Sequence, residues 1–248
     1  MELETVMNTL RDKMEGLCIS DRLTTVNAPK LQQLLEANWD KVMEAYESEE
    51  KGAIAYFDKL VENCKKICAV DIGWAGSGAI SMSYLFEKVW GFDSSLIGII
   101  AGTNSIHNFE SDASESYLLS GKLVSYMYSQ THNRDLLKIH NPNKDYNVFW
   151  ELLLSSPTKQ FKGFGYDEES GQPKLYFGHE DYNTEGICQI QKGILDFVID
   201  YKKHFEEFPY MFNVSGRDAY APMIVAASYN ERYLKSIEKK FALEINVS

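Results

Sequence analysis

The residues best suited to chemistry lie together in the segment Asp-Ile-Gly-Trp-Ala-Gly-Ser-Gly, which spans residues 71–78. It supplies a carboxylate at Asp71, an indole at Trp74 and a hydroxyl at Ser77. Its glycines are Gly73, Gly76 and Gly78. An apolar run precedes the segment, and a helical repeat of apolar residues follows it. The pattern predicts a strand, a glycine turn and a helix, an arrangement that brings backbone N–H groups close to an anion.

Three interpretations of this turn stay open. The glycines can serve only to allow a tight turn between strand and helix. They can also leave N–H groups free to bind a phosphate or nucleotide at the start of the helix. Third, the segment is similar to the acidic, glycine-rich first motif of S-adenosylmethionine-dependent methyltransferases. It departs from that motif by one extra residue between Gly73 and Gly76, and the next strand ends in Ala-Gly-Thr-Asn instead of an acidic residue.

Three other site motifs do not occur at this turn. No lysine follows it, so a P-loop is not predicted, and the spacing Gly-x-Gly-x-x-Gly is missing. Ser77 also lacks the Gly-x-Ser-x-Gly spacing of a nucleophile elbow. We therefore expect Ser77 to cap the helix or to donate to a phosphate, and not to act as a nucleophile.

A second apolar run, residues 96–104, is rich in β-branched residues and predicts a strand that is buried on both faces. A helix at residues 79–90 would join it to the first strand in a right-handed βαβ unit. This geometry places both turns at the carboxyl end of a parallel sheet. Ligands of open α/β sheets bind at that end.

This end of the sheet supplies the candidate ligand-binding residues. Trp74, Ser77 and Asn104 are expected to line one depression there. The indole of Trp74 would either stack on a base or sugar or pack under the turn. Thr103 belongs to the second turn, and His107 belongs to the polar loop that follows it.

Two carboxylates are the candidate catalytic groups. Asp71 can orient a ligand hydroxyl, hold a metal ion or cap nearby N–H groups. Glu151 lies within the apolar helical stretch Phe-Trp-Glu-Leu-Leu, where a charged group needs a partner or a role. No metal site is predicted, because Cys64 and Cys68 have no second close pair and no histidine at ligand spacing. All four cysteines are expected to be buried, reduced thiols.

The patterns together predict an α/β fold: a Rossmann-like, mostly parallel sheet with a helical N-terminal lead-in and a C-terminal hairpin plus helices. Amphipathic helices fill residues 1–63, and one of them is expected to start at Ser48. Residues 64–248 would form the α/β domain. Within it, hairpin strands flank residues 167–173, and a long helix covers residues 183–206.

The composition limits the partners of the chain. Its 248 residues carry a formal net charge of -11. This charge argues against nucleic acid as a partner, because neutralising phosphates requires a basic surface. No apolar run is long enough for a membrane helix, and the first residues lack the pattern of a secretory signal. These features predict a cytoplasmic protein.

Three stretches of the chain occur in an order that resembles a known group of proteins. They are Val70–Ser77, Phe149–Pro157 and Ile190–Phe197. They resemble the region after the phosphatase-like part of predicted haloacid-dehalogenase-superfamily proteins from bacterial surface-polysaccharide gene clusters, which are often fused to glycosyltransferases. The likeness covers roughly residues 50–205. The positions that match are Asp71, Gly73, Trp74, Gly76, Ser77, Glu151, Pro157 and Gln191, and the last joins the candidate ligand-binding residues.

The resemblance implies a sugar-nucleotide or phosphosugar-handling domain in surface-polysaccharide biosynthesis, such as a transferase. It does not imply phosphohydrolase activity, because the sequence after Asp71 lacks the second aspartate of the superfamily's Asp-x-Asp motif. A non-catalytic binding or scaffold module and a methyltransferase are the alternatives. The expected partners are a small phosphorylated or sugar ligand and a glycosyltransferase or phosphatase-like domain. The sequence identifies no cofactor.

Overall fold

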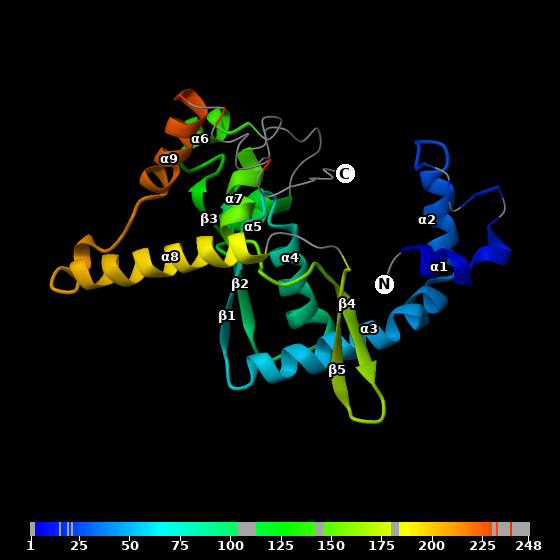
Figure 1. Cartoon of the computed structure of the whole chain (residues 1–248). Coiled ribbons are helices and arrows are strands. Elements are labelled where there is room, and N and C mark those ends of the chain that lie inside the picture. Colours follow the sequence, from blue (N-terminus) through cyan, green and yellow to red (C-terminus); the bar gives the residue numbers. More distant parts are fainter. Residues whose placement is uncertain are drawn as a thin grey trace. The chain divides into compact units, whose positions relative to one another are not determined.

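The computed structural model describes residues 3–14, 16–18, 20, 22–103, 113–141, 146–179, 184–229, 232 and 239. The predicted α/β class is confirmed, because these residues include a parallel sheet of three strands and an antiparallel hairpin. The chain divides into two compact units (Figure 1). The N-terminal unit comprises residues 1–62 and 160–180, and the sheet unit comprises residues 63–159 and 181–248. The boundary between a lead-in of 1–63 and a domain of 64–248 stays a prediction.

The N-terminal unit opens with short helical segments. They are α1 (Leu3–Thr9), the 3-10 turn η1 (Arg11–Lys13) and α2 (Ala28–Ala37). Pro29 lies in the first turn of α2, where its missing N–H costs nothing. Val6 and Leu10 pack against Val42 of the next helix and form a small apolar core.

The next helix, α3 (Trp39–Val61), is one continuous element of 23 residues. The helix start predicted at Ser48 is therefore wrong. The chain breaks earlier, at Asn38, where the side-chain amide donates a hydrogen bond to the Leu34 carbonyl oxygen, 2.8 Å away. Asn38 therefore satisfies a carbonyl at the end of α2 and marks the junction with α3.

The predicted hairpin is present in the same unit. Its strands, β4 (Phe161–Asp167) and β5 (Gln172–Phe177), pair antiparallel. Phe164 of β4 contacts the rings of Tyr56 and Phe57 on α3, with centroids 5.4 and 5.8 Å apart. The helix approaches the strand closely at Gly52, where an added Cβ would lie 2.1 Å from the Gly165 carbonyl oxygen.

The sheet unit contains the predicted βαβ arrangement. Its strands are β1 (Lys66–Asp71), β2 (Ser95–Gly102) and β3 (Leu123–Tyr128). They run parallel in the order β1-β2-β3, with Asp71 opposite Ile100. The first connection is α4 (Ser77–Tyr84), which continues as a π-helical turn, η2 (Leu85–Val89). The second connection includes α5 (Ala113–Leu119). Because the strands are parallel, the turns after β1 and β2 lie at the same end of the sheet.

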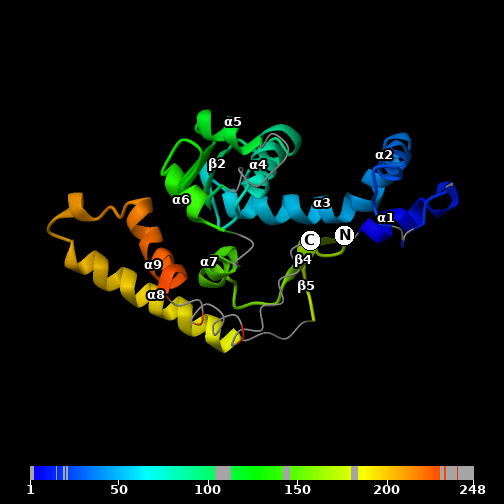
Figure 2. The ribbon, with the colours of Figure 1, turned by 90° about the horizontal axis from the view of Figure 1, so that it is seen from above.

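One face of this sheet is covered by α4 and α5, which lie beside β2 when the unit is seen from above (Figure 2). Ala79 of α4, Ile100 and Leu123 form the buried core there. The expectation that the second strand is buried on both faces is wrong, since burial alternates along β2 and Ile97 is 36% exposed. Consecutive strand order explains this, because crossovers of one hand that advance in one direction lie on the same face.

Further helices gather at the carboxyl end of the strands (Figure 1). They are α6 (Arg134–Ile139), α7 (Tyr146–Leu154) and α9 (Gly216–Tyr229). Together with the ends of the strands they bury an aromatic-rich core of Trp74, Met127, Tyr128, Leu136, Leu137, Tyr146, Tyr220 and Met223. The predicted long helix is α8 (Thr184–His204), which the short turn η5 (Pro209–Met211) follows. None of the described helices is long and apolar enough to cross a membrane.

The close approach of α3 to β4 predicts that Gly52→Ala destabilises the N-terminal unit by about 1–3 kcal/mol, the usual cost of overpacking. The new methyl would meet backbone oxygen, which cannot move aside without shifting the strand. Gly193→Ala in α8 is the matched control, because a methyl there meets nothing within 4 Å. That variant should gain roughly 0.5–1 kcal/mol from helix propensity. Urea unfolding followed by circular dichroism measures the free energy of unfolding of both variants. Equal changes in the two variants would contradict the close contact between α3 and β4.

Candidate functional site

The glycine turn joins the end of β1 to the start of α4. The Gly73 N–H donates a hydrogen bond to Asp71 Oδ1, 2.7 Å away, so the carboxylate closes the turn. Gly76 has a φ of 69°, which favours glycine, and a side chain there would collide with Leu123. Gly76, not Ser77, occupies the N-cap position of α4. Ser77 is the first helical residue and is exposed, so the expected capping role is not seen.

The carboxylate of Asp71 lies against both ends of the turn. Its Oδ2 is 2.5 Å from the point where a Cβ of Gly73 would be and 3.6 Å from that of Gly78. Glycine at position 73 therefore leaves the room that the carboxylate fills. The negative charge stands next to the first turn of α4, where a bound phosphate would otherwise be stabilised. Of the three interpretations of the turn, phosphate binding directly at this position is the least favoured by electrostatics.

Trp74 is buried beneath the turn, with 8% of its surface exposed. Its indole Nε1–H donates a hydrogen bond to Glu151 Oε1 at 2.9 Å. Glu151 lies on α7, so this bond joins the turn after β1 to a helix residue that lies 77 positions after Trp74 in the chain. The Glu151 carboxylate, for which the sequence indicates no partner, thus accepts a hydrogen bond from the indole N–H. The buried N–H in turn needs an acceptor. A direct contact of Trp74 with a ligand stays a prediction.

The same chain of hydrogen bonds continues to α8. The Ser155 hydroxyl donates to the Glu151 carbonyl oxygen, 2.8 Å away. The Gln191 side-chain amide donates to the Ser155 carbonyl oxygen, 2.6 Å away. The three stretches that carry the family resemblance are therefore joined in space, although long segments separate them in the sequence. Gln191 contributes to this connection, and its contact with a ligand stays a prediction.

The face of the Trp74 indole is covered by His140, which sequence reasoning missed. The two rings are stacked at 26°, with centroids 4.5 Å apart. His140 is 1% exposed and is held at both nitrogens. Nδ1 lies 2.8 Å from the Tyr220 hydroxyl, and Nε2 lies 2.5 Å from Asn147 Oδ1. No spacing in the sequence indicates the partners of His140, because Trp74, Asn147 and Tyr220 come from three other parts of the chain.

The direction of these hydrogen bonds follows from the chemistry of the partners. The Asn147 oxygen can only accept, so His140 Nε2 donates to it, and in the neutral imidazole Nδ1 then accepts the proton of the Tyr220 hydroxyl. Burial, and then the neighbouring Tyr146, raise the pKa of Tyr220. The hydroxyl therefore keeps its proton at neutral pH and remains a donor. Burial also raises the pKa of Tyr128, whose ring lies beside His140 with centroids 5.4 Å apart.

The second turn contributes Thr103 at the same end of the sheet. Its N–H donates to the Tyr128 carbonyl oxygen at 3.3 Å, and its side chain is fully buried. Among the described residues, the hydroxyl groups of Thr103 and Tyr128 have no hydrogen-bond partner. The other two predicted residues of this region, Asn104 and His107, lie outside the described residues, and so does their part of the expected depression.

The remaining groups that could bind a metal ion or react as thiols are the cysteines and the acidic side chains. Cys18, Cys64, Cys68 and Cys188 are free thiols, but all four are exposed, so the expectation of buried thiols is wrong. Cys68 shows the reason, because it lies on an edge strand whose residues alternate between covered and open faces. Within the described ranges, no group of three or more His, Cys, Asp or Glu side chains is placed to hold a metal ion.

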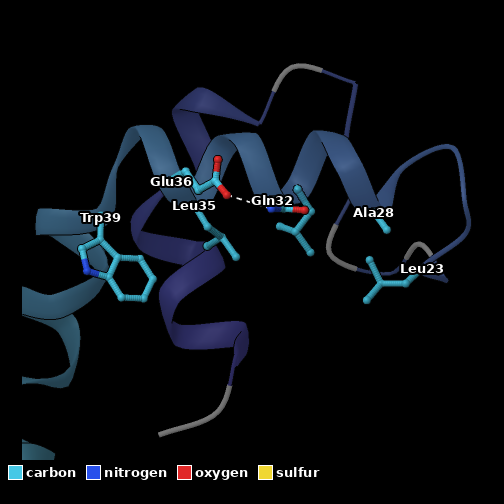
Figure 3. Close-up of a pocket in the computed structure, with 7 residues that line it drawn as sticks. Leu23, Ala28, Gln32, Leu35, Glu36 and Trp39 are labelled. Atoms are coloured by element: carbon cyan, nitrogen blue, oxygen red, sulfur yellow. Dashed lines mark hydrogen bonds between the residues drawn. The ribbon is translucent and has the colours of Figure 1, made fainter. Parts of the chain in front are cut away.

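A separate pocket lies along α2 in the N-terminal unit (Figure 3). It has a volume of about 320 Å³ and is lined mainly by apolar side chains, including Leu23, Leu35 and Trp39. At its side, Gln32 donates to Glu36 at 2.8 Å. None of the residues predicted to form the site lines this pocket.

Comparisons of the chain with protein families, with curated proteins and with solved structures find no match. The candidate site is therefore defined by its own geometry: a carboxylate that closes a glycine turn, and a buried tryptophan beneath the turn that is held by Glu151 and His140.

The bond between Trp74 and Glu151 can be tested by two substitutions. Glu151→Gln keeps an oxygen that accepts the indole N–H, so stability should fall by no more than about 1 kcal/mol. Glu151→Ala leaves the buried N–H without an acceptor and should cost about 1–3 kcal/mol. Thermal unfolding gives the stabilities, and the Trp74 indole cross-peak in ¹H–¹⁵N spectra reports the bond. An indole cross-peak that stays in place in both variants would contradict the contact.

Proposed function

We propose that the glycine turn and α7 bind a sugar-containing small molecule, a sugar nucleotide or phosphosugar, as part of surface-polysaccharide assembly. One observation carries the proposal: the carboxylates of Asp71 and Glu151 both accept hydrogen bonds from residues of the same turn. Asp71 accepts the Gly73 N–H, and Glu151 accepts the Trp74 indole N–H. Each carboxylate has lone pairs beyond the one it uses, and carboxylates are good acceptors for the hydroxyl groups of a sugar.

The two carboxylates would take different parts. Glu151 is partly buried and is committed to Trp74, so its main part is to hold the turn. Asp71 closes the turn at the carboxyl end of β1, where ligands of open α/β sheets bind, and this place makes it the better candidate for contact with the ligand. A sugar or ribose hydroxyl suits this position better than a phosphate, because the hydroxyl can donate to the carboxylate and carries no charge to repel it.

A transferase reaction is consistent with such a site. The hydroxyl of an acceptor would attack the anomeric carbon of the bound sugar, the bond from that carbon to the phosphate oxygen would break, and the nucleoside diphosphate would leave. Asp71 would receive the proton of the attacking hydroxyl as a general base. The setting, in which a glycosyltransferase or phosphatase-like domain works beside this chain in the cytoplasm, comes from the family resemblance and from composition.

S-adenosylmethionine-dependent methyl transfer is the second candidate, and the position of Asp71 favours it. A carboxylate at a glycine turn attracts the cationic ammonium group of that cofactor as well as a ribose hydroxyl. The second strand ends at Gly102 and Thr103 follows it, so the acidic strand end that would hold the ribose is missing there. This departure leaves the sugar ligand as the preferred reading.

A ligand screen tests the proposal. UDP-glucose, GDP-mannose, S-adenosylmethionine and inorganic phosphate would each be added at millimolar concentration while thermal unfolding is recorded, since a ligand of the folded state raises the melting temperature. We expect a nucleotide sugar to stabilise the protein and inorganic phosphate to have little effect. Stabilisation by S-adenosylmethionine alone would replace the sugar proposal with methyl transfer. No stabilisation by any of them would overturn both.

Calorimetry on Asp71→Asn then tests the named carboxylate. The asparagine oxygen can still accept the Gly73 N–H, so the turn should survive, while the charge-assisted bond to the ligand is lost. Affinity for the stabilising nucleotide sugar should fall roughly tenfold or more, the equivalent of about 1.5 kcal/mol. Asp200→Asn, on the exposed face of α8, is the matched control and should leave affinity unchanged. Equal affinity in both variants would remove Asp71 from the site.

A further inference from the structure

The side chain beneath the glycine turn is held from two directions. Glu151 fixes the edge of the Trp74 indole through the 2.9 Å hydrogen bond, and His140 covers its face at a centroid distance of 4.5 Å. Trp74 directly follows Gly73, whose N–H bonds to Asp71. The indole and the N–H that closes the turn therefore belong to adjacent residues, so a shift of the indole would be transmitted through the backbone to the Asp71 contact.

The use of a histidine at this place needs an explanation, because an apolar ring would fill the space at lower cost. Burying an imidazole removes two polar nitrogens from water, which is costly unless both are hydrogen-bonded. Both are, through Tyr220 and Asn147. Two bonds at opposite ends of the ring fix its rotation, which stacking alone would leave free. The ring plane is thereby set close to that of Trp74, with 26° between them.

The element that supplies Tyr220 is itself anchored to the sheet. At the start of α9, an added Cβ on Gly216 would lie 2.1 Å from the Tyr126 carbonyl oxygen, so the helix touches the backbone of β3. The Tyr126 hydroxyl donates to the Val214 carbonyl oxygen at 2.7 Å. Arg217 makes two hydrogen bonds, of 2.8 and 2.7 Å, to the carboxylate of Asp135 on α6. Tyr220 thus projects from a fixed helix.

We propose that His140 is the positioning residue of the glycine turn: oriented by Tyr220 and Asn147, it sets the Trp74 indole and through it the placement of Gly73 and the Asp71 carboxylate. This role in the turn stands on the contacts alone. The consequence for ligand affinity rests on the proposed function. His140 is 1% exposed and stacks on Trp74, so its effect is exerted through the indole.

The test measures the position of the turn directly. In ¹H–¹⁵N spectra, the Trp74 indole cross-peak, assigned with Trp74→Phe, and the amide cross-peaks of Gly73 and Gly76 report the turn. His140→Gln removes the stacked ring and should shift all three. Tyr220→Phe removes one hydroxyl and should shift them in the same direction by less. If His140→Gln does not fold, Tyr220→Phe alone decides the matter.

Tyr210→Phe is the matched control, because it also removes one tyrosine hydroxyl, from a side chain that is 76% exposed and whose ring contacts Phe208. It should leave the three cross-peaks in place. Unmoved cross-peaks in the His140 and Tyr220 variants, or equal shifts in the control, would overturn the positioning role.

Binding of UDP-glucose then separates this inference from the proposed function. If the wild-type protein binds UDP-glucose, His140→Gln and Tyr220→Phe should weaken the affinity several-fold, whereas Tyr210→Phe should not. Unchanged affinity together with shifted cross-peaks would overturn the link from the turn to the ligand. If the wild-type protein does not bind UDP-glucose, the sugar proposal fails for that ligand, and the cross-peaks still decide whether His140 positions the turn.

Discussion

The hydrogen bond from Trp74 to Glu151 is the interaction on which the candidate site depends. A buried indole N–H and a carboxylate in an apolar helix would each cost free energy if left alone, and each satisfies the other at 2.9 Å. The bond fixes the distance between the end of β1 and α7. Ser155 and Gln191 extend the connection to α8, so one local pairing determines how three distant stretches meet.

The position of β1 explains why the turn needs such support. Among the described strands, β1 pairs with β2 alone and is the edge of the sheet. In a doubly wound sheet, a strand on the other side would form a crevice beside the turn after β1. Here the described chain places His140 and Glu151 under the turn instead. The aromatic core at the carboxyl end of the strands thus supports the turn from below, in addition to the pairing of β1 with β2.

The sequence predicted those parts of the fold that local patterns determine. The glycines after Asp71, the hairpin residues and the periodicity of α8 each specify an element without reference to distant residues. His140 and Tyr220 lie 80 positions apart, and nothing in either neighbourhood indicates their contact. The predictions that β2 and the cysteines are buried failed for a related reason. The exposure of a side chain depends on which helices cover its face of the sheet, and the order of the strands in space determines where those helices lie. A carboxylate among apolar residues is costly, so the surroundings of Glu151 in the sequence are a local signal of a distant partner.

The charge of Asp71 decides which part of a ligand can approach the turn. A phosphate charge at about 4 Å from the carboxylate would be repelled by roughly 4 kcal/mol at an effective dielectric constant near 20. The start of α4 would return about 0.3–1 kcal/mol to an anion at a partly exposed helix end. Repulsion therefore outweighs attraction, and the glycine turn selects against the phosphate that such turns often bind. A hydroxyl gains a charge-assisted hydrogen bond at the same place, worth about 1.5–3 kcal/mol. A sugar nucleotide would accordingly present a sugar or ribose hydroxyl to Asp71, with its phosphates farther from the carboxylate.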